Sequence, residues 1–148
     1  MIIRRALPED ISEIYKMMID MYSRIEIPAS PVSSQKLLNI INSAIHKGIV
    51  LVAEIEGKII GSIGGMANSD WWSEEQHLGD LWFYIYPNKR NSRAAVKLVR
   101  TFINVGKEIN MKVKLGHFYS GDIDRKDKFF DRLGFVKTGS LYTETENG

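Results

Sequence analysis

Residues 83–102 read FYIYPNKRNSRAAVKLVRTF, and this stretch decides the fold. It opens with a run of aromatic and β-branched residues that is typical of a strand, and Pro87 ends that strand. A short basic segment comes next. Apolar residues then recur at helical spacing, at Ala95, Leu98, Val99, Phe102 and Ile103. We therefore expect a strand, a basic loop and a helix in immediate succession.

The basic loop has the character of an anion-binding site. The first N–H groups of a helix have no partner within that helix, and the helix dipole adds positive potential there. Arg90 and Arg93 add fixed charge, and their guanidinium groups suit phosphate oxygens. The same pattern also fits a capped surface helix with solvated arginines. Spacing alone leaves both interpretations open.

The flanking sequence predicts a single mixed α/β domain over residues 1–148. We expect strands at 2–6, 49–55, 59–66, 78–86, 111–118 and 135–143, and helices that begin at Pro8, at Ser33 or Ser34, after Ser92 and at Asp122. Glycines at 61, 64 and 65 are unusual inside a strand and indicate a bulge or a close approach of other backbone.

Composition excludes several classes of protein. The chain has no cysteine, which excludes disulfides, a thiolate nucleophile and a cysteine metal site. His46, His77 and His117 are far apart and show no ligand spacing, so we expect no metal. No apolar run is long enough to span a membrane and no signal peptide is evident, so we expect a cytoplasmic protein without a membrane partner. The net charge of +2 and the lack of a basic stripe disfavour nucleic acid as a partner.

Five segments, in order, resemble the GNAT superfamily of acyl-CoA-dependent N-acyltransferases. They are residues 2–11, 52–61, 83–87, 90–95 and 129–135, and the last contains a Leu-Gly-Phe sequence. The resemblance covers nearly the whole chain. It implies a central mixed sheet of about six strands flanked by four helices, with the fourth and fifth strands splayed apart.

The resemblance also implies acetyl-CoA as the co-substrate. The pantetheine arm would pair with the backbone of Phe83, Tyr84 and Ile85. The pyrophosphate would lie against the loop and the start of the helix, at Arg90, Asn91, Ser92, Arg93, Ala94, Ala95 and Val96.

Three positions depart from the family pattern. Arg93 replaces the middle glycine of the loop, where we expect an ordinary helical φ that tolerates a side chain. Phe130 stands where many members carry the tyrosine that protonates the leaving thiolate. The usual asparagine after the fifth strand is missing near Ile123. These departures affect the catalytic acid rather than the fold.

Without cysteine, direct attack of a neutral amine on acetyl-CoA is the natural scheme, and it requires a base. Asp80 is the first candidate for the base and His77 the second, and both precede the aromatic part of the fourth strand. Tyr119 is the first candidate for the acid and Tyr142 the second. The alternatives are a solvated turn residue for Asp80, a surface histidine for His77 and a packed aromatic for Tyr119.

The expected acceptor is a primary amine of a small molecule or a protein, and a homodimer is compatible with the resemblance. Trp71 and Trp72 lie in a polar loop and suit an acceptor pocket or a partner contact. The plainer expectation is that one covers the edge of the core and the other is partly exposed. The alternative function is a catalytically impaired module that binds acyl-CoA or a partner, which the three departures motivate.

Overall fold

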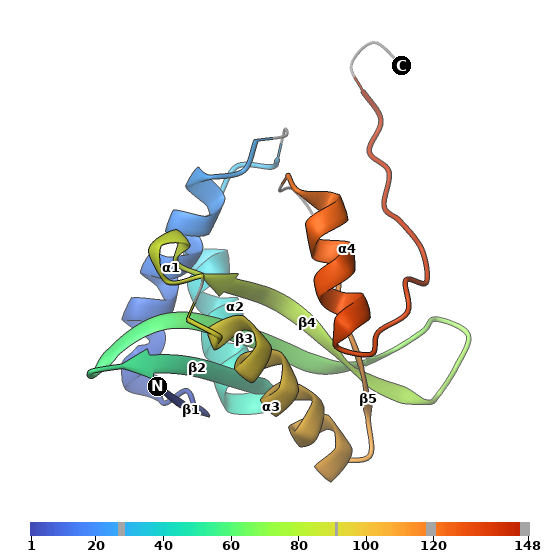
Figure 1. Cartoon of the computed structure of the whole chain (residues 1–148), viewed down its shortest axis with the longest axis horizontal. Coiled ribbons are helices and arrows are strands. Elements are labelled where there is room, and N and C mark those ends of the chain that lie inside the picture. Colours follow the sequence, from blue (N-terminus) through green and yellow to red (C-terminus); the bar gives the residue numbers. More distant parts are fainter. Residues whose placement is uncertain (27–28, 91, 118–120, 146–148) are drawn as a thin grey trace.

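A computed structural model describes residues 1–26, 29–90, 92–117 and 121–145 (Figure 1). Its elements in chain order are β1 (Ile2–Arg5), a 3₁₀ turn (Pro8–Asp10), α1 (Ile11–Ser23), α2 (Ser34–Lys47), β2 (Ile49–Ile55), β3 (Lys58–Ser69), β4 (Gln76–Ile85), a second 3₁₀ turn (Pro87–Lys89), α3 (Ala94–Glu108), β5 (Lys112–Lys114) and α4 (Ile123–Arg132). No helix in these ranges is long and apolar enough to cross a membrane.

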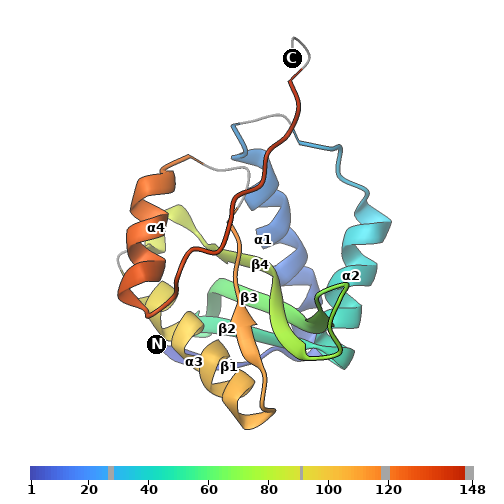
Figure 2. The same ribbon diagram turned by 90° about the vertical axis from the view of Figure 1, so that its right-hand side faces the viewer.

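The strands form one sheet in the order β1-β2-β3-β4-β5, and every neighbouring pair is antiparallel except β4 with β5. Helices α1 and α2 cover one face of the sheet, and α3 and α4 cover the other (Figures 1 and 2). The predicted mixed α/β architecture is confirmed.

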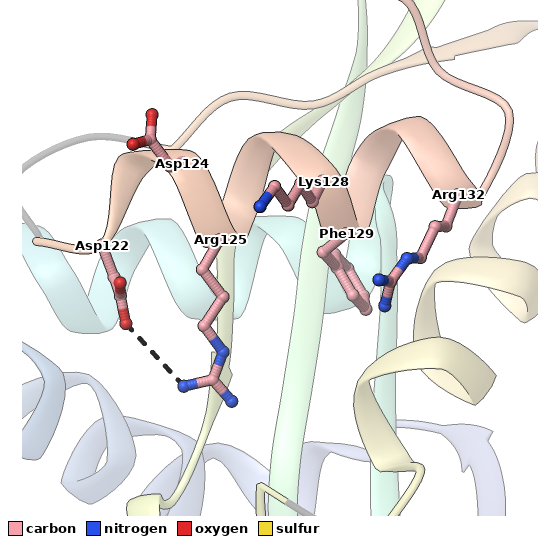
Figure 3. A pocket seen from close by; sticks show the side chains of 6 residues that line it. All are labelled: Asp122, Asp124, Arg125, Lys128, Phe129 and Arg132. Atoms are coloured by element: carbon pink, nitrogen blue, oxygen red, sulfur yellow. Dashed lines mark ion pairs between the residues drawn. The ribbon is translucent and has the colours of Figure 1, made fainter.

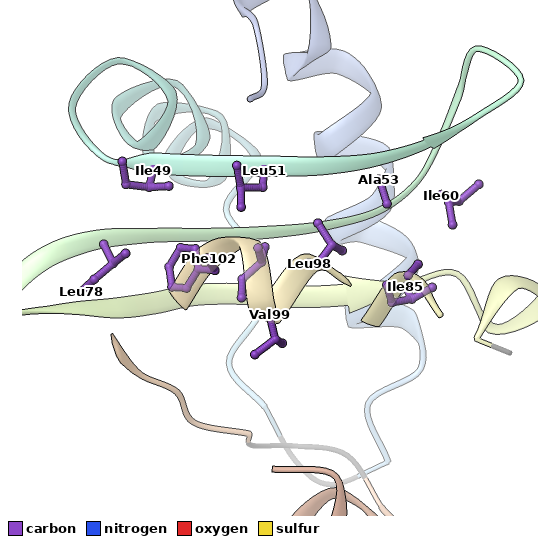
Figure 4. Close-up of a cluster of buried hydrophobic side chains, with 11 residues drawn as sticks. Ile49, Leu51, Ala53, Ile60, Leu78, Ile85, Leu98, Val99 and Phe102 are labelled. Atoms are coloured by element: carbon purple, nitrogen blue, oxygen red, sulfur yellow. The ribbon is translucent and has the colours of Figure 1, made fainter. Parts of the chain in front are cut away.

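Strand alternation divides the core between the two faces of the sheet. On β2, Leu51 packs toward α3 and the next residue, Val52, packs toward α1 and α2. Leu98 and Phe102 of α3 are fully buried and meet the side chains of β2, β3 and β4 (Figure 4). The opposite face is filled by Ile14, Met17 and Met18 of α1, Ile41 and Ala44 of α2, and Val50, Val52, Trp82 and Tyr84 of the sheet.

Local chemistry explains the element boundaries. Ser33 caps α2 by accepting a hydrogen bond from the Lys36 N–H at 3.3 Å. The hairpin between β2 and β3 turns at Glu56 and Gly57, and both have positive φ, at 50° and 78°. A two-residue turn of this kind matches the twist of the strands on either side.

Strands β4 and β5 pair only at their beginnings. His77, Leu78 and Gly79 are opposite Lys112, Val113 and Lys114, and β5 then ends. Strand β4 continues from Asp80 to Ile85, paired on one side with β3. We call the space on its other side the β4–β5 opening. The splay that the sequence predicts is thus present.

The last predicted strand, at residues 135–143, is wrong. The described residues after α4 form no strand, and five strands are present in the described ranges instead of about six. The physical reason is that β5 is only three residues long and offers a short edge for pairing. Phe135 still packs against the core, and the segment after it runs along the surface, with Val136 81% and Leu141 61% exposed.

Candidate active site

Beyond Gly79, the edge of β4 that faces away from β3 has no partner strand among the described residues. The Tyr86 N–H donates to the Ile60 carbonyl on β3 at 3.0 Å, whereas the Ile85 carbonyl accepts from Arg90 Nε at 3.1 Å. Backbone groups of successive residues point to opposite sides of a strand. Phe83 and Ile85 therefore face the β4–β5 opening, and the backbone of Tyr84 faces β3.

A bulge in β4 lies at the vertex of this opening. Gly65 pairs with Asp80 and Gly64 pairs with Trp82, so Leu81 is the extra residue on β4. The two glycines are required because a Cβ on Gly64 would lie 2.4 Å from the Trp82 ring and a Cβ on Gly65 would lie 2.4 Å from the Gly79 carbonyl oxygen. The bulge and close approach predicted from the glycines are present.

Asp80 lies at this vertex and is part of the strand rather than a solvated turn. Its Oδ1 accepts a hydrogen bond at 3.1 Å from the backbone N–H of Gly116, which follows β5. Burial raises the pKa of Asp80 to about 6, against the lowering effects of the Gly116 hydrogen bond and the His117 charge. A carboxyl with this pKa is ionised at neutral pH and remains basic enough to take a proton.

His77 is not brought together with Asp80. A Cβ on Gly79 would lie 3.7 Å from the His77 ring, so these two residues share a face of β4. Asp80 lies on the other face, with Leu78. His77 instead lines a shallow surface pocket with residues of the β3–β4 hairpin and β5, namely Asp70, Trp72, Ser73, Glu75, Gln76, Lys112 and Lys114.

The two tryptophans of the hairpin are both exposed, Trp71 by 92% and Trp72 by 68%. Their rings contact each other edge to face, with centroids 5.4 Å apart. The expectation that one of them covers the edge of the core is wrong. The loop of residues 70–75, between the end of β3 at Ser69 and the start of β4 at Gln76, carries both side chains past the sheet.

The basic loop leads into α3 through a left-handed residue. Arg93 precedes α3 with φ 65° and ψ 4°. The expectation of an ordinary helical φ at Arg93 is therefore wrong, because the chain must reverse at this point to enter the helix. A side chain in this conformation costs about 1–2 kcal/mol, which explains why a glycine suits the position.

The remaining loop positions differ in what they offer to an anion. Ser92 donates both its N–H and its Oγ–H to the Lys89 carbonyl, at 3.2 and 2.5 Å. The N–H groups of Ala94, Ala95 and Val96 begin α3 and have no partner within the helix. Asn91 lies outside the described residues.

Helix α4 adds cations to the same region. Arg125, Lys128 and Arg132 line a pocket together with Phe129, Asp122 and Asp124 (Figure 3). In Figure 3 Arg125, Phe129 and Arg132 point to the same side of the helix. The pKa of Lys126 is lowered, first by burial and then by the charge of Arg90. The charge of Asp122 acts on the pKa of Lys126 in the opposite direction to Arg90.

A row of rings connects β4 with the segment after β5. Phe83 stacks on Phe129, Phe129 meets Phe130 edge to face, and Phe130 stacks on the imidazole of His117. His117 Nε2 lies 3.2 Å from Oδ1 of Asp127 on α4. Phe130 thus packs inside an aromatic cluster and has no group to donate a proton. Tyr119 lies outside the described residues, and Tyr142 is 89% exposed.

The side chain of Tyr84 packs on the face of β4 that α1 and α2 cover. Its hydroxyl donates to Asp20 of α1 at 2.6 Å, and Arg24 pairs with the same carboxylate at 3.0 Å. Burial, followed by the Asp20 hydrogen bond, raises the pKa of Tyr84 to about 12. Arg90 lies over the Tyr84 ring, 5.4 Å from its centroid. The arginine of the loop is therefore held against the end of β4 by the ring and by the Ile85 carbonyl.

The sequence reading missed His117, Asp127 and the α4 cations. A signal existed for the cations, because Arg125, Lys128 and Arg132 recur every three or four residues in a segment read as a helix. No local signal marked His117, since its partners Asp127 and Phe130 are ten and thirteen residues further along the chain.

Comparison with known proteins places this geometry in a family. The family model of the acetyltransferase (GNAT) family matches residues 12–135. No curated protein sequence matches the chain significantly. A predicted acetyltransferase of Clostridium acetobutylicum, solved with acetyl-CoA, has a TM-score of 0.76 at 17% identity, over 97% of this chain and 95% of that one.

Two aminoglycoside-related structures are also similar. AAC(6′)-Iy, in complex with the bisubstrate analogue CoA-S-monomethyl-acetylneamine, has a TM-score of 0.77 at 14% identity, over 98% of this chain and 97% of that one. The aminoglycoside 6′-N-acetyltransferase of Acinetobacter haemolyticus has a TM-score of 0.73 at 14% identity, over 99% and 98%. At such identities these structures share the fold with this chain. With its family match over most of its length and its splayed β4 and β5, the chain belongs to the GNAT acetyltransferase family.

Proposed function

We propose that the protein transfers an acetyl group from acetyl-CoA directly to a primary amine of a small molecule or a protein. The observation that carries the proposal is the open edge of β4, which ends at a loop and a helix N-terminus suited to phosphate. An extended pantetheine arm needs such an edge, and the pyrophosphate at its end needs such a helix.

The cofactor would bind along β4 mainly through backbone groups. The pantetheine amides would pair with Phe83 and Ile85, whose backbone faces the opening. Arg90 then has to release the Ile85 carbonyl. The pyrophosphate would accept from the N–H groups of Ala94, Ala95 and Val96, with Arg90 on one side and Lys126 of α4 on the other. Asn91, Ser92 and Arg93 complete the proposed loop site.

The chemistry at the vertex would divide between a base and backbone donors. Asp80 would accept a proton from the amine as it attacks the thioester carbon. A backbone N–H on the open edge of β4 would donate to the oxyanion that forms. The proposed base lies beside the Gly116 backbone, which limits its access to water and holds its carboxylate in place.

An amine acceptor is supported by two structural neighbours, an aminoglycoside 6′-N-acetyltransferase and AAC(6′)-Iy in complex with CoA-S-monomethyl-acetylneamine. A cytoplasmic location and the absence of nucleic acid, membrane and metal partners belong to the same proposal.

Thermal unfolding with acetyl-CoA tests the binding part of the proposal, with ATP as the control ligand. At about 100 times its Kd, acetyl-CoA should stabilise the fold by about 2.7 kcal/mol and raise Tm by about 5–10 °C. ATP should give a smaller shift, because it lacks the pantetheine arm. No shift with millimolar acetyl-CoA would overturn the proposal.

A matched pair of variants localises the site. Val96→Glu places a carboxylate in the first turn of α3, where it suits the helix but repels a pyrophosphate. Val96→Gln has nearly the same shape and no charge. We expect Glu to weaken acetyl-CoA binding about tenfold or more relative to Gln. Equal affinities would place the phosphates elsewhere.

The alternative function is a module that binds acyl-CoA without turnover. Phe130 motivates it, because phenylalanine has no group to donate a proton. Acetylation of any member of an amine panel, with release of free CoA, decides between the two. Asp80→Asn should then lower kcat by about 10²–10⁴-fold and leave the acetyl-CoA affinity in place. Tight acetyl-CoA binding without transfer to any amine would favour the binding module.

A further inference from the structure

We propose that His117, oriented by Asp127, is the general acid that protonates the departing CoA thiolate, in place of the tyrosine that Phe130 replaces. This inference rests on the proposed acetyl transfer. It names the acid of that reaction, for which the sequence offered Tyr119.

The position of His117 is the first argument. Its imidazole lies flat on the Phe130 ring, with centroids 5.8 Å apart and an angle of 9° between the planes. Phe130 and Phe129 connect it with Phe83, whose backbone faces the β4–β5 opening. The residue before it, Gly116, donates to Asp80 at the vertex of the opening, so His117 follows directly on the point where β4 and β5 diverge.

The partner of His117 is the second argument. Nε2 lies 3.2 Å from Oδ1 of Asp127, and the nearby Lys137 Nζ lies 3.2 Å from the other oxygen of that carboxylate. The pKa of Asp127 is lowered, by the His117 hydrogen bond first and the Lys137 hydrogen bond second. The ionised carboxylate accepts from Nε2–H and leaves Nδ1 as the nitrogen that exchanges a proton. It also fixes the ring orientation, as a carboxylate does in a catalytic histidine pair.

The relation of His117 to Asp80 is the third argument. Asp80 binds the N–H of Gly116, the residue before His117, and the charge of His117 acts on the Asp80 carboxyl. A base and an acid are therefore neighbours at the vertex. Among the described residues, the charged groups that bear on His117 are Asp80 from β4, Asp127 from α4 and Lys137 beyond α4, whose contact is with Asp127.

The proton balance closes within this pair. The neutral amine attacks the thioester carbon and forms the new C–N bond, and Asp80 takes a proton from the nitrogen. The C–S bond then breaks with its electron pair on sulfur, and the imidazolium gives its proton to the thiolate. The products are the acetamide and the free thiol of CoA. Transfer of the proton from Asp80 to His117, directly or through water, restores both groups.

The test compares His117→Gln with His46→Gln in steady-state acetyl transfer across pH. His46 is an exposed histidine of α2, remote in sequence from the site, and should leave the kinetics unchanged. We expect His117→Gln to lower kcat at least tenfold with an unchanged KM for acetyl-CoA. The pH dependence of kcat should change, because the group that gives its proton to the thiolate is gone. In His117→Gly, which leaves room for an imidazole, added imidazole should restore part of kcat.

Asp127→Asn provides a second variant that keeps the hydrogen-bond acceptor and lies at the surface. Loss of its charge should lower kcat and alter the pH dependence of kcat, with an unchanged KM for acetyl-CoA. Unchanged pH profiles in both variants would overturn the inference while leaving acetyl transfer intact. A parallel loss of kcat in Tyr119→Phe alone would instead assign the acid to Tyr119. Absence of transfer by the unsubstituted protein would contradict the proposed function itself.

Discussion

The carboxylate of Asp80 accepts a hydrogen bond from the backbone N–H of Gly116 at 3.1 Å. Asp80 lies one residue past Gly79, the last β4 position that pairs with β5. The contact joins the two strands where they begin to diverge, so it defines the inner end of the β4–β5 opening. It also places an ionisable group at the point where a thioester would arrive.

The pH dependence of stability should reveal the burial of Asp80. Its pKa is about 6 in the folded protein against an ordinary value of 3.8, so the folded state binds more protons between these values. Stability from this group is complete below about pH 4 and is lost as the pH rises through 6. The expected loss is on the order of 3 kcal/mol.

Urea unfolding of Asp80→Asn and of the unsubstituted protein checks this expectation. Asparagine cannot ionise, so the variant should gain stability relative to the unsubstituted protein as the pH rises from 4 to 7. Asp10, Asp20 and Asp127 have lowered pKa values and act in the opposite direction, but they are common to both proteins and cancel. A difference that does not vary with pH would show that Asp80 is not buried as described.

The left-handed conformation of Arg93 predicts an unusual preference for glycine. Arg93→Gly and Arg93→Ala both remove the charge, but only glycine removes the Cβ that is strained at φ 65°. The glycine variant should be more stable than the alanine variant by about 1 kcal/mol, measured by urea unfolding. Higher stability of the alanine variant would mean that the loop enters α3 through an ordinary helical φ.

The bulge in β4 should not tolerate a side chain at Gly64. Gly64→Ala would place a methyl group 2.4 Å from the buried Trp82 ring and should cost about 1–3 kcal/mol of stability. Gly79→Ala is the matched control in the same sheet, because its methyl group would meet only His77 at 3.7 Å. Equal stabilities of the two variants would contradict the close approach of β3 to Trp82.

The hydroxyl of Tyr84 should contribute to stability through Asp20. Tyr84→Phe removes a 2.6 Å hydrogen bond to a carboxylate and should cost about 1.5–3 kcal/mol. Tyr142→Phe removes the same group from a side chain that is 89% exposed and should cost nothing measurable. Thermal unfolding of both variants gives the comparison. Unchanged stability of Tyr84→Phe would show that the hydrogen bond between β4 and α1 does not stabilise the fold.

Much of the fold could be predicted because it depends on local patterns. The apolar spacing of α3 and the Ser33 cap both act within a few residues. The last predicted strand failed because residues 135–143 need a partner edge, which the three-residue β5 does not supply. The pairing of two strands that are far apart in the sequence is not encoded in the residues of either strand alone.

The candidate site was less accessible to sequence reasoning. Asp80 was selected because it lies at the start of the fourth strand, where the resemblance to the GNAT superfamily implies a base, whereas its raised pKa comes from burial in the folded protein. His117 was not selected from the sequence, because its contacts with Asp127 and Phe130 form only when α4 packs beside it. Arg93 was misjudged because φ depends on how the chain enters α3 rather than on residue type.

Mass spectrometry of acetyl transfer tests the central claim most directly. The full chain is incubated with acetyl-CoA and a panel of primary amines, which includes aminoglycosides, polyamines and lysine-containing peptides. The account predicts one amine class that gains the mass of an acetyl group in step with release of free CoA, and loss of this transfer in Asp80→Asn. Release of CoA without any acetylated amine, or transfer that Asp80→Asn leaves intact, would contradict it.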